Sequence, residues 1–161
     1  MKITTPHGTL EGDNIEAIVG EHGYNCLRGA DLCGFDLTGT RLCGVDLTNA
    51  RLLRSDLTGV DLRVADLTGA NLHRANMTGA NLAGATLTNA SLRAANLLKA
   101  DLRHASLCDV NLYNARLTGA DLSHADLTDA NLRAANLTGA ILYDAKLPDA
   151  DMTDAKPGDS K

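Results

Sequence analysis

Leucine recurs at every fifth position of this chain from Leu27 to Leu147, and Met77 and Met152 are the only replacements in the series. Two residues before each of these central positions lies a mostly small residue, which is Ala throughout 65–150 except for Val110. The series comprises twenty-six consecutive five-residue units without an insertion. A fixed period of this kind predicts a repeat protein in which each unit contacts only its neighbours.

A period of five fits neither an α-helix nor a β-strand. Five residues of helix turn by about 500°, so the leucines would spiral around it, and in a strand an odd spacing sends them to opposite faces. The chain can bury every leucine only if it turns a corner once per unit. Many units have a residue that tolerates positive φ two positions after Leu: Gly39, Asn49, Gly59, Gly69, Gly79, Gly84, Asn89, Gly119 and Gly139. The pattern predicts an all-β solenoid whose successive coils pair their backbones.

The units resemble those of a known family. Ala65-Asp66-Leu67-Thr68-Gly69 and Ala135-Asn136-Leu137-Thr138-Gly139 are similar to the A-(D/N)-L-x-x signature of pentapeptide repeat proteins, and the resemblance covers residues 25 to about 155. It implies a right-handed quadrilateral β-helix with four units per coil. The chain would then form about six and a half coils and a rod roughly 31 Å long, at ~4.8 Å per coil. The structural core would include Leu67, Leu72, Leu82, Leu87, Leu92, Leu97 and Leu102.

Residues 1–24 lie outside the repeat and are expected to form an N-terminal cap. The segment from Asp13 to Gly20 predicts a short helix with Asp13 as N-cap, Glu16 at the capping-box position and Gly20 as its end. Ile15, Ile18 and Val19 would share one face of this helix and cover the open end of the β-helix. The alternative is a regulatory or docking role.

The C-terminal end differs, because no amphipathic helix follows the last coil. Pro148 is expected to end the regular turn chemistry, and residues 156–161 are expected to form a polar, disordered tail. The strand edge around Leu147 and Met152 would be exposed and open to pairing. We therefore expect a monomer or a weak end-to-end dimer.

Composition argues for one domain and for a cytoplasmic location. The 161 residues contain no Trp and one Phe, no apolar run long enough to cross a membrane, and no signal peptide at the N-terminus. None of the four cysteines lies twenty residues from another, so stacking of the coils predicts no disulfide and the thiols are expected to be reduced. They are Cys26, Cys33, Cys43 and Cys108.

Catalytic and metal-binding motifs are missing from the sequence. It has no phosphate-binding loop, zincin motif or serine nucleophile elbow. The aspartates that precede so many leucines recur with the scaffold, which favours a structural role over an active site. His104 and His124 are twenty residues apart and should stack, but no metal site is expected because nothing near them in the pattern completes one. The sequence predicts a protein that is not an enzyme and needs no cofactor.

Charge is unevenly distributed when units are sorted by side of the predicted rod. An acidic side has six aspartates against Arg28 and Lys146: Asp46, Asp66, Asp109, Asp126, Asp129 and Asp149. The next side, here called the arginine side, has acids only near its ends, and its candidate partner-binding residues are Arg51, Arg54, Arg74, Arg93, Tyr113 and Arg133. Tyr113 is expected to lie between the guanidinium groups of Arg93 and Arg133. The alternative to partner binding is that this side is simply a solvated surface whose arginines contact neighbouring Asn and Tyr side chains.

These features predict a rigid interaction scaffold that docks an unknown acidic protein partner on its arginine side. Direct nucleic-acid binding is not expected, because the net charge is −5.

The resemblance implies an alternative, since some family members mimic DNA, bind DNA gyrase or topoisomerase IV and confer fluoroquinolone resistance. Duplex DNA carries one charge per ~1.7 Å, and six aspartates over roughly 31 Å give only about a third of that density. The C-terminal dimerisation helix and the coil-breaking loops of gyrase-binding members are also missing from this sequence.

Overall fold

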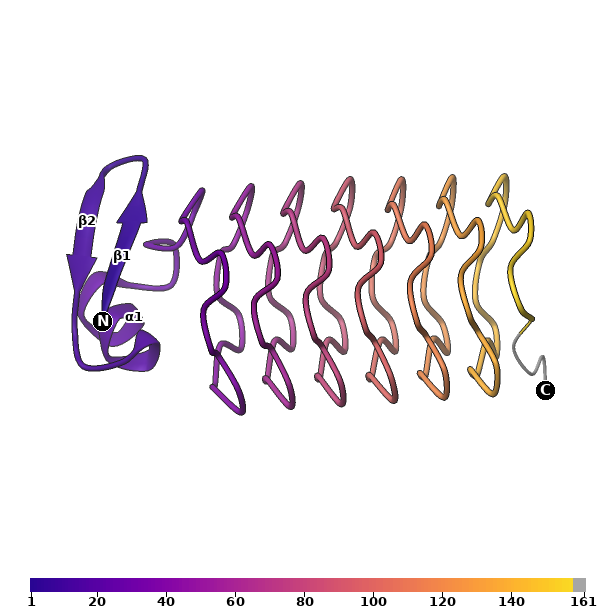
Figure 1. Cartoon of the computed structure of the whole chain (residues 1–161), viewed down its shortest axis with the longest axis horizontal. Helices are drawn as coiled ribbons and strands as arrows, with labels where there is room; N and C mark the ends of the chain where they lie inside the picture. The colour runs from indigo at the N-terminus through magenta and orange to yellow at the C-terminus, as the bar shows by residue number, and fades with distance from the viewer. Residues whose placement is uncertain (158–161) are drawn as a thin grey trace.

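The computed structural model describes residues 1–157, which form a rod of stacked coils with a small folded element at one end (Figure 1). That element consists of strand β1 (Lys2–Thr5), strand β2 (Gly8–Glu11) and helix α1 (Ile15–His22). β1 and β2 pair in an antiparallel hairpin, and Thr4 of β1 also pairs with Asp31 of the first coil. The coils then continue without interruption toward the other end.

The interior five-residue units repeat one set of backbone hydrogen bonds. In the unit centred on Leu67, Leu67 N donates to Thr86 O at 2.7 Å and Asp66 N donates to Val45 O at 3.0 Å, so one unit bonds to the coil after it and the coil before it. Ala70 N donates to Leu67 O at 2.9 Å and closes the turn. From Asp31–Arg51 to Asn136–Lys156 the parallel bridges join residues twenty apart. Four units therefore make one turn of the β-helix.

The second residue after each central Leu or Met, here called the corner residue, has a positive φ. The corner residues run from Gly29 to Asp154 with φ between 52° and 70°, and sixteen of them are not glycine. The glycines and asparagines of the sequence thus mark a turn that the fold also imposes where neither residue is present. Val64 is the most strained of these, because a β-branched residue at φ 58° is a conformational outlier.

Where an Asp or Asn precedes the central residue, its side chain stabilises this turn. Asp66 Oδ1 accepts the backbone N–H of Thr68 at 2.9 Å, and the same contact recurs from Asp31 to Asp151. In Asp56 and Asp126 the hydroxyl and the backbone N–H of the following Thr hold the pKa of the carboxyl below its usual value. These aspartates serve the scaffold.

The core is a column of leucines and small residues along the axis of the rod. The central residues from Leu27 to Leu137 are all 0–1 % exposed, including the seven named from the sequence. Ile15, Ile18 and Val19 of α1 belong to the same cluster, so the apolar face of the helix packs on the first coil. At the other end Leu142 and Leu147 are only partly buried, and Met152 is 36 % exposed.

The helix boundaries expected from the sequence are wrong at both ends. The N-cap is Asn14, whose Oδ1 accepts the N–H of Ala17 at 2.8 Å. The helix continues through Gly20 to His22, and its C-cap is Gly23, whose positive φ of 86° stops the helix. Glu16 makes no capping box, since its Oε1 accepts the N–H of Arg41 at 3.1 Å.

The expected end of the repeat is also wrong. Pro148 lies inside a regular unit, and its carbonyl accepts the N–H of Asp129 at 3.0 Å. Its position contributes only a carbonyl to the ladder between coils, so the missing N–H costs nothing there. Lys156, expected in the tail, donates its N–H to Ala135 O at 2.9 Å and pairs with Asn136. The remaining tail residues, 158–161, lie outside the described part.

Candidate interaction surface

The arginine side is held by the ladder, and its two end arginines are paired with carboxylates. Arg51 Nη1 lies 2.9 Å from Asp31 Oδ2, and Arg133 Nε lies 3.8 Å from Asp151 Oδ2. Since both arginine side chains are more than half exposed, solvent screens both pairs. The acids near the ends of this side therefore offset part of its positive charge.

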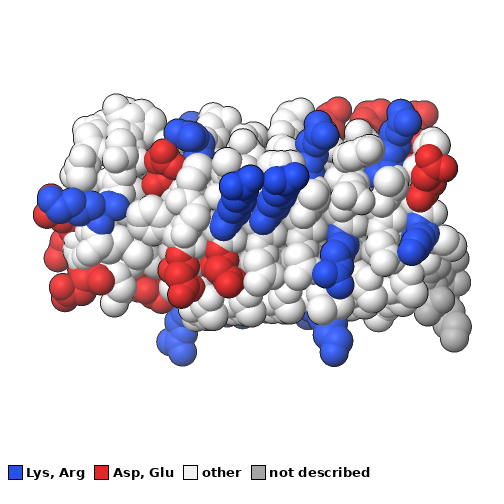
Figure 2. Space-filling view, viewed as in Figure 1, with Lys and Arg blue, Asp and Glu red and all other residues white. Residues whose placement is uncertain are grey.

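Arg54 and Arg74 are different, because neither has a salt-bridge partner within the part of the chain that the structure describes. Both are exposed corner residues on consecutive coils, with φ of 56° and 57°. The two residues occupy the same corner of the rod, one coil apart. Figure 2 shows Lys and Arg side chains spread along the rod on the face in view, with two of them side by side near its middle.

The ring of Tyr113 contacts the guanidinium group of Arg93 on one face. The guanidinium carbon of Arg93 lies 5.2 Å from the centroid of its ring. The expected second contact, from Arg133, is not among the cation–π contacts of the described residues, because that guanidinium turns toward Asp151. Tyr113 is 41 % exposed, so the ring and Arg93 together present a flat, cationic surface.

The acidic side is less negative than its sequence suggests. Arg28 Nη1 lies 3.0 Å from Asp46 Oδ2, and Lys146 Nζ lies 3.5 Å from Asp126 Oδ2. The Asp46, Asp66 and Asp126 side chains also accept backbone N–H groups of their own turns. The other three aspartates, Asp109, Asp129 and Asp149, are corner residues stacked on consecutive coils.

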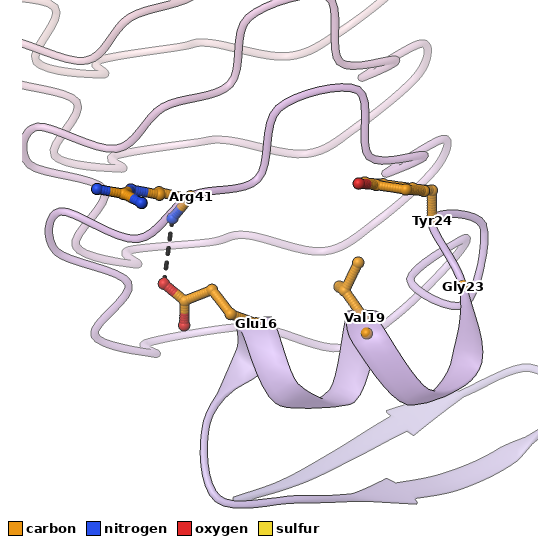
Figure 3. A pocket seen from close by; sticks show the side chains of 6 residues that line it. Glu16, Val19, Gly23, Tyr24 and Arg41 are labelled. Carbon is orange, nitrogen blue, oxygen red and sulfur yellow. Dashed lines mark hydrogen bonds between the residues drawn. The ribbon is translucent and has the colours of Figure 1, made fainter.

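A cavity that the sequence did not predict lies between α1 and the first coils. Its volume is about 310 Å³, and it is lined by Glu16, Val19, Gly20, Gly23, Tyr24 and Arg41. Figure 3 shows Glu16 and Val19 on α1 facing the segment that carries Arg41, with Tyr24 across from them. The Glu16 carboxylate is held by the backbone N–H of Arg41. The opposite charges of Glu16 and Arg41 leave the cavity close to neutral.

The two histidines expected to stack do so, and the structure adds two neighbours that the sequence argument missed. The rings of His104 and His124 are parallel within 3°, with centroids 4.8 Å apart. His124 Nδ1 lies 3.1 Å from Asp144 Oδ2, and Tyr143 meets the same ring edge-on at 5.4 Å. Asp144 is a corner residue twenty positions after His124, so the repeat itself contained this signal.

Within residues 1–157, no group of three or more His, Cys, Asp or Glu side chains is arranged to hold a metal ion. The four cysteines are free thiols, and burial raises the pKa of Cys26 and Cys33. None of the described helices has the length and apolar character needed to cross a membrane.

Comparison with known proteins identifies the family. The family profile described as "Pentapeptide repeats" matches residues 26–63, 64–93, 87–123 and 115–154, with 8 copies. This chain is a pentapeptide repeat protein. The resemblance expected from the A-(D/N)-L-x-x units is thereby confirmed, and no curated protein matches the chain in sequence.

Solved structures of pentapeptide repeat proteins are similar to this β-helix. QnrB1, a plasmid-mediated fluoroquinolone resistance protein, is 18 % identical with a TM-score of 0.58, over 78 % of this chain and 76 % of its own. Rfr23 from the cyanobacterium Cyanothece 51142 is 25 % identical with a TM-score of 0.45, over 78 % of this chain and 90 % of its own. A pentapeptide repeat protein of the Arabidopsis thaliana thylakoid lumen is 33 % identical with a TM-score of 0.40, over 67 % and 68 %. At these levels the likeness to QnrB1 shows a shared fold alone.

Proposed function

We propose that this pentapeptide repeat protein is a rigid, non-catalytic scaffold that binds an acidic protein partner through its arginine side. The proposal rests on Arg54 and Arg74, whose guanidinium groups have no salt-bridge partner among the described residues. The contact between Arg93 and Tyr113 lies on the same side of the rod. In this proposal the rod is a right-handed quadrilateral β-helix of about six and a half coils, capped by α1, that works in the cytoplasm.

Rigidity supports this role. Each unit has a turn hydrogen bond, and the interior units also have backbone bonds to the coils before and after them. The arginines are therefore presented at fixed spacing, and little backbone entropy is lost when a partner binds. Guanidinium groups with no internal carboxylate can donate bidentate hydrogen bonds to carboxylates of the partner.

A protein partner fits better than a nucleic acid. The net charge of −5 and the adjacent acidic side oppose the approach of a long polyanion. Binders of single strands also use several aromatic platforms, whereas Tyr113 is the only aromatic residue among those proposed to bind. A short acidic segment can contact the middle of the arginine side without meeting the acidic side.

The proposal can be tested with a labelled poly-glutamate peptide as a defined acidic probe. The double variant Arg54→Gln/Arg74→Gln should weaken its binding at least about tenfold, because it removes two guanidinium groups that have no carboxylate partner within the described chain. The matched control, Arg63→Gln/Arg103→Gln, removes the same charge on another side, where Asp61 and Asp101 pair these arginines at 2.7 Å. Equal loss in both doubles would show a general charge effect and contradict the arginine side as the binding surface.

Protein capture then extends the test to natural partners. The triple variant Arg74→Glu/Arg93→Glu/Arg133→Glu should lose partners that the wild type retains, with thermal stability nearly unchanged because all three side chains are exposed. An unaltered set of captured proteins would rule out the arginine side.

The acidic side supports a second candidate function, modulation of DNA gyrase or topoisomerase IV. Its column of three aspartates at consecutive corners is the feature that favours it. The pairing of Asp46 with Arg28 and of Asp126 with Lys146 lowers the negative charge of this side, so the scaffold is preferred. A gyrase supercoiling assay with and without a fluoroquinolone separates the two, since inhibition or drug protection at micromolar protein would favour modulation.

Weak end-to-end self-association remains part of the proposal. The partial exposure of Leu142, Leu147 and Met152 leaves apolar surface that a second copy would cover. We expect the light-scattering mass to rise with concentration, and a constant monomeric mass at high concentration would refute it.

A further inference from the structure

The strongest unassigned feature is a column of side chains on the side built around Leu102, Leu122 and Leu142. His104, His124 and Asp144 are corner residues of three consecutive coils, with φ of 58°, 60° and 54°. The ladder thus holds two imidazoles and a carboxylate in register, and all three side chains are exposed. This side is separate from the arginine side.

The contact with Asp144 determines which nitrogen of His124 is available. Since Asp144 Oδ2 lies 3.1 Å from His124 Nδ1, a neutral His124 carries its proton on Nδ1 and donates it to the carboxylate. The Nε2 lone pair is then free to bind a ligand. A carboxylate hydrogen-bonded to the second nitrogen is the usual support of a metal-binding histidine. Tyr143 packs edge-on against the same ring and limits its rotation.

We propose that His104 and His124 form a two-histidine binding site for a borderline-soft divalent cation such as Zn²⁺, with Asp144 orienting His124. Imidazole nitrogens suit Zn²⁺, Ni²⁺ and Cu²⁺ better than Mg²⁺ or Ca²⁺. With two protein ligands, the remaining positions are filled by water or by a ligand from a partner. The site is therefore weak and open, in keeping with the absence of any three-ligand group in residues 1–157.

The geometry requires a small rearrangement. Because Zn–N bonds are about 2.0–2.1 Å, the two Nε2 atoms must come within about 4 Å of each other. The ring centroids are 4.8 Å apart, so binding tilts the outer ring edges together and ends the parallel stacking. Both rings are exposed, and His104 makes no side-chain hydrogen bond within the described chain, so it is free to tilt.

The charges that face the column favour a cation. Asp101 and Asp121 lie on the same side of the rod, and Arg103 is paired with both, at 2.7 Å and 3.8 Å. With Asp144, three carboxylates then stand against one guanidinium, which leaves a local negative charge. This excess attracts a divalent ion without supplying the hard oxygen cage that Ca²⁺ prefers.

Zinc titration of the whole chain tests the site, with the ring resonances of the five histidines followed by NMR and the heat by calorimetry. We expect the His104 and His124 resonances to shift together and to saturate with one ion per chain at micromolar concentration. His104→Asn or His124→Asn should abolish this binding, and Asn tolerates the positive φ, so the fold is retained. Asp144→Asn should weaken it about tenfold, as loss of a supporting carboxylate does.

The matched control is His73→Asn, which removes a histidine from the arginine side and should leave zinc binding unchanged. The histidine resonances also separate this site from the free thiols, which can take up zinc on their own. Unchanged binding in both His104→Asn and His124→Asn would overturn the proposal. So would equal shifts of all five histidines.

Discussion

The two ends of the leucine column are built from the same repeat and are buried very differently. At the N-terminal end Leu27 is fully buried although no coil precedes it, because Ile15 and Ile18 of α1 pack against the first coil. Toward the other end of the described chain, Leu147 is only partly buried and Met152 is 36 % exposed. Burial in this fold therefore depends on the neighbour of a unit, and the unit alone does not provide it.

The difference shows what the pentapeptide contributes. A unit supplies a central leucine, a small residue and a corner, but the leucine and the small residue are fully buried only when a coil or α1 lies on both sides. The interior coils have neighbours on both sides, the first coil has α1 in place of one, and the last described coil lacks this cover. The following substitutions test whether burial decreases in this order, from the interior coils to the first coil and then to the last described coil.

The largest effect is expected from Leu87→Ala in the middle of the column. Leu87 is 0 % exposed with coils on both sides, so its truncation leaves a cavity and should cost about 3 kcal/mol of unfolding free energy. The matched change Leu147→Ala should cost less than about 1 kcal/mol, because solvent already reaches that site. Denaturant unfolding measures both, and equal losses would contradict the ranking.

The second-largest effect is expected from a substitution in α1, which covers the first coil. Ile18→Ala should cost about 2 kcal/mol and expose the first coil, because Ile18 is 0 % exposed and packs in the shared core. Met152→Ala at the other end should change stability by less than about 0.5 kcal/mol. Hydrogen exchange provides the local reading, since protection should fall at Leu32 and Leu37 in Ile18→Ala. Unchanged protection there would show that α1 does not hold the first coil.

A stabilising change is expected inside the ladder, where corner strain is tolerated. Val64 has φ 58° and is 70 % exposed, so Val64→Gly should relieve strain and raise the unfolding free energy by about 1 kcal/mol. Ala94→Gly, at φ 52°, is the control without β-branching and should gain less. If both variants gain equally, the branched side chain has no special cost.

The smallest effect concerns pH. The folded-state pKa of Asp56 is lowered by its hydrogen bonds to Thr58, so this carboxylate stabilises the fold above the unfolded pKa of ~3.9. That stabilisation is lost as the pH falls through the lower, folded value. Asp56→Asn keeps an oxygen acceptor and should flatten the loss of stability below about pH 4. Thermal melts at neutral and acidic pH measure it, and an unchanged acid slope would contradict this cause.

Much of the fold could be predicted from the residues. The five-residue period excluded helices and strands of ordinary length, and the sequence of the units was sufficient to identify the family. The helix was placed correctly on Ile15, Ile18 and Val19, but its ends were missed by one to three residues. Asn14 and Asp13 are both good N-caps, and only the packing of the chain selects between them. The hairpin of β1 and β2 was missed, because two four-residue strands give too short a pattern.

The candidate site could be predicted only in part. The sequence correctly places Arg54, Arg74 and Arg93 along one side of the predicted rod, but it does not show which guanidinium is free. That depends on whether a carboxylate lies one coil away, as Asp31 does for Arg51 and Asp151 for Arg133. The contact between His124 and Asp144 also joins residues on neighbouring coils, since they are twenty positions apart.

The sequence by itself determined the period, the buried column and the side on which each polar residue lies, because a strict repeat permits only one way to bury every fifth residue. The tertiary structure decided the partners of those polar residues, the cover on the first coil and the strain at corners such as Val64. These depend on side-chain directions and on contacts between successive coils. A one-dimensional pattern fixes which residues are neighbours, but not how their side chains meet.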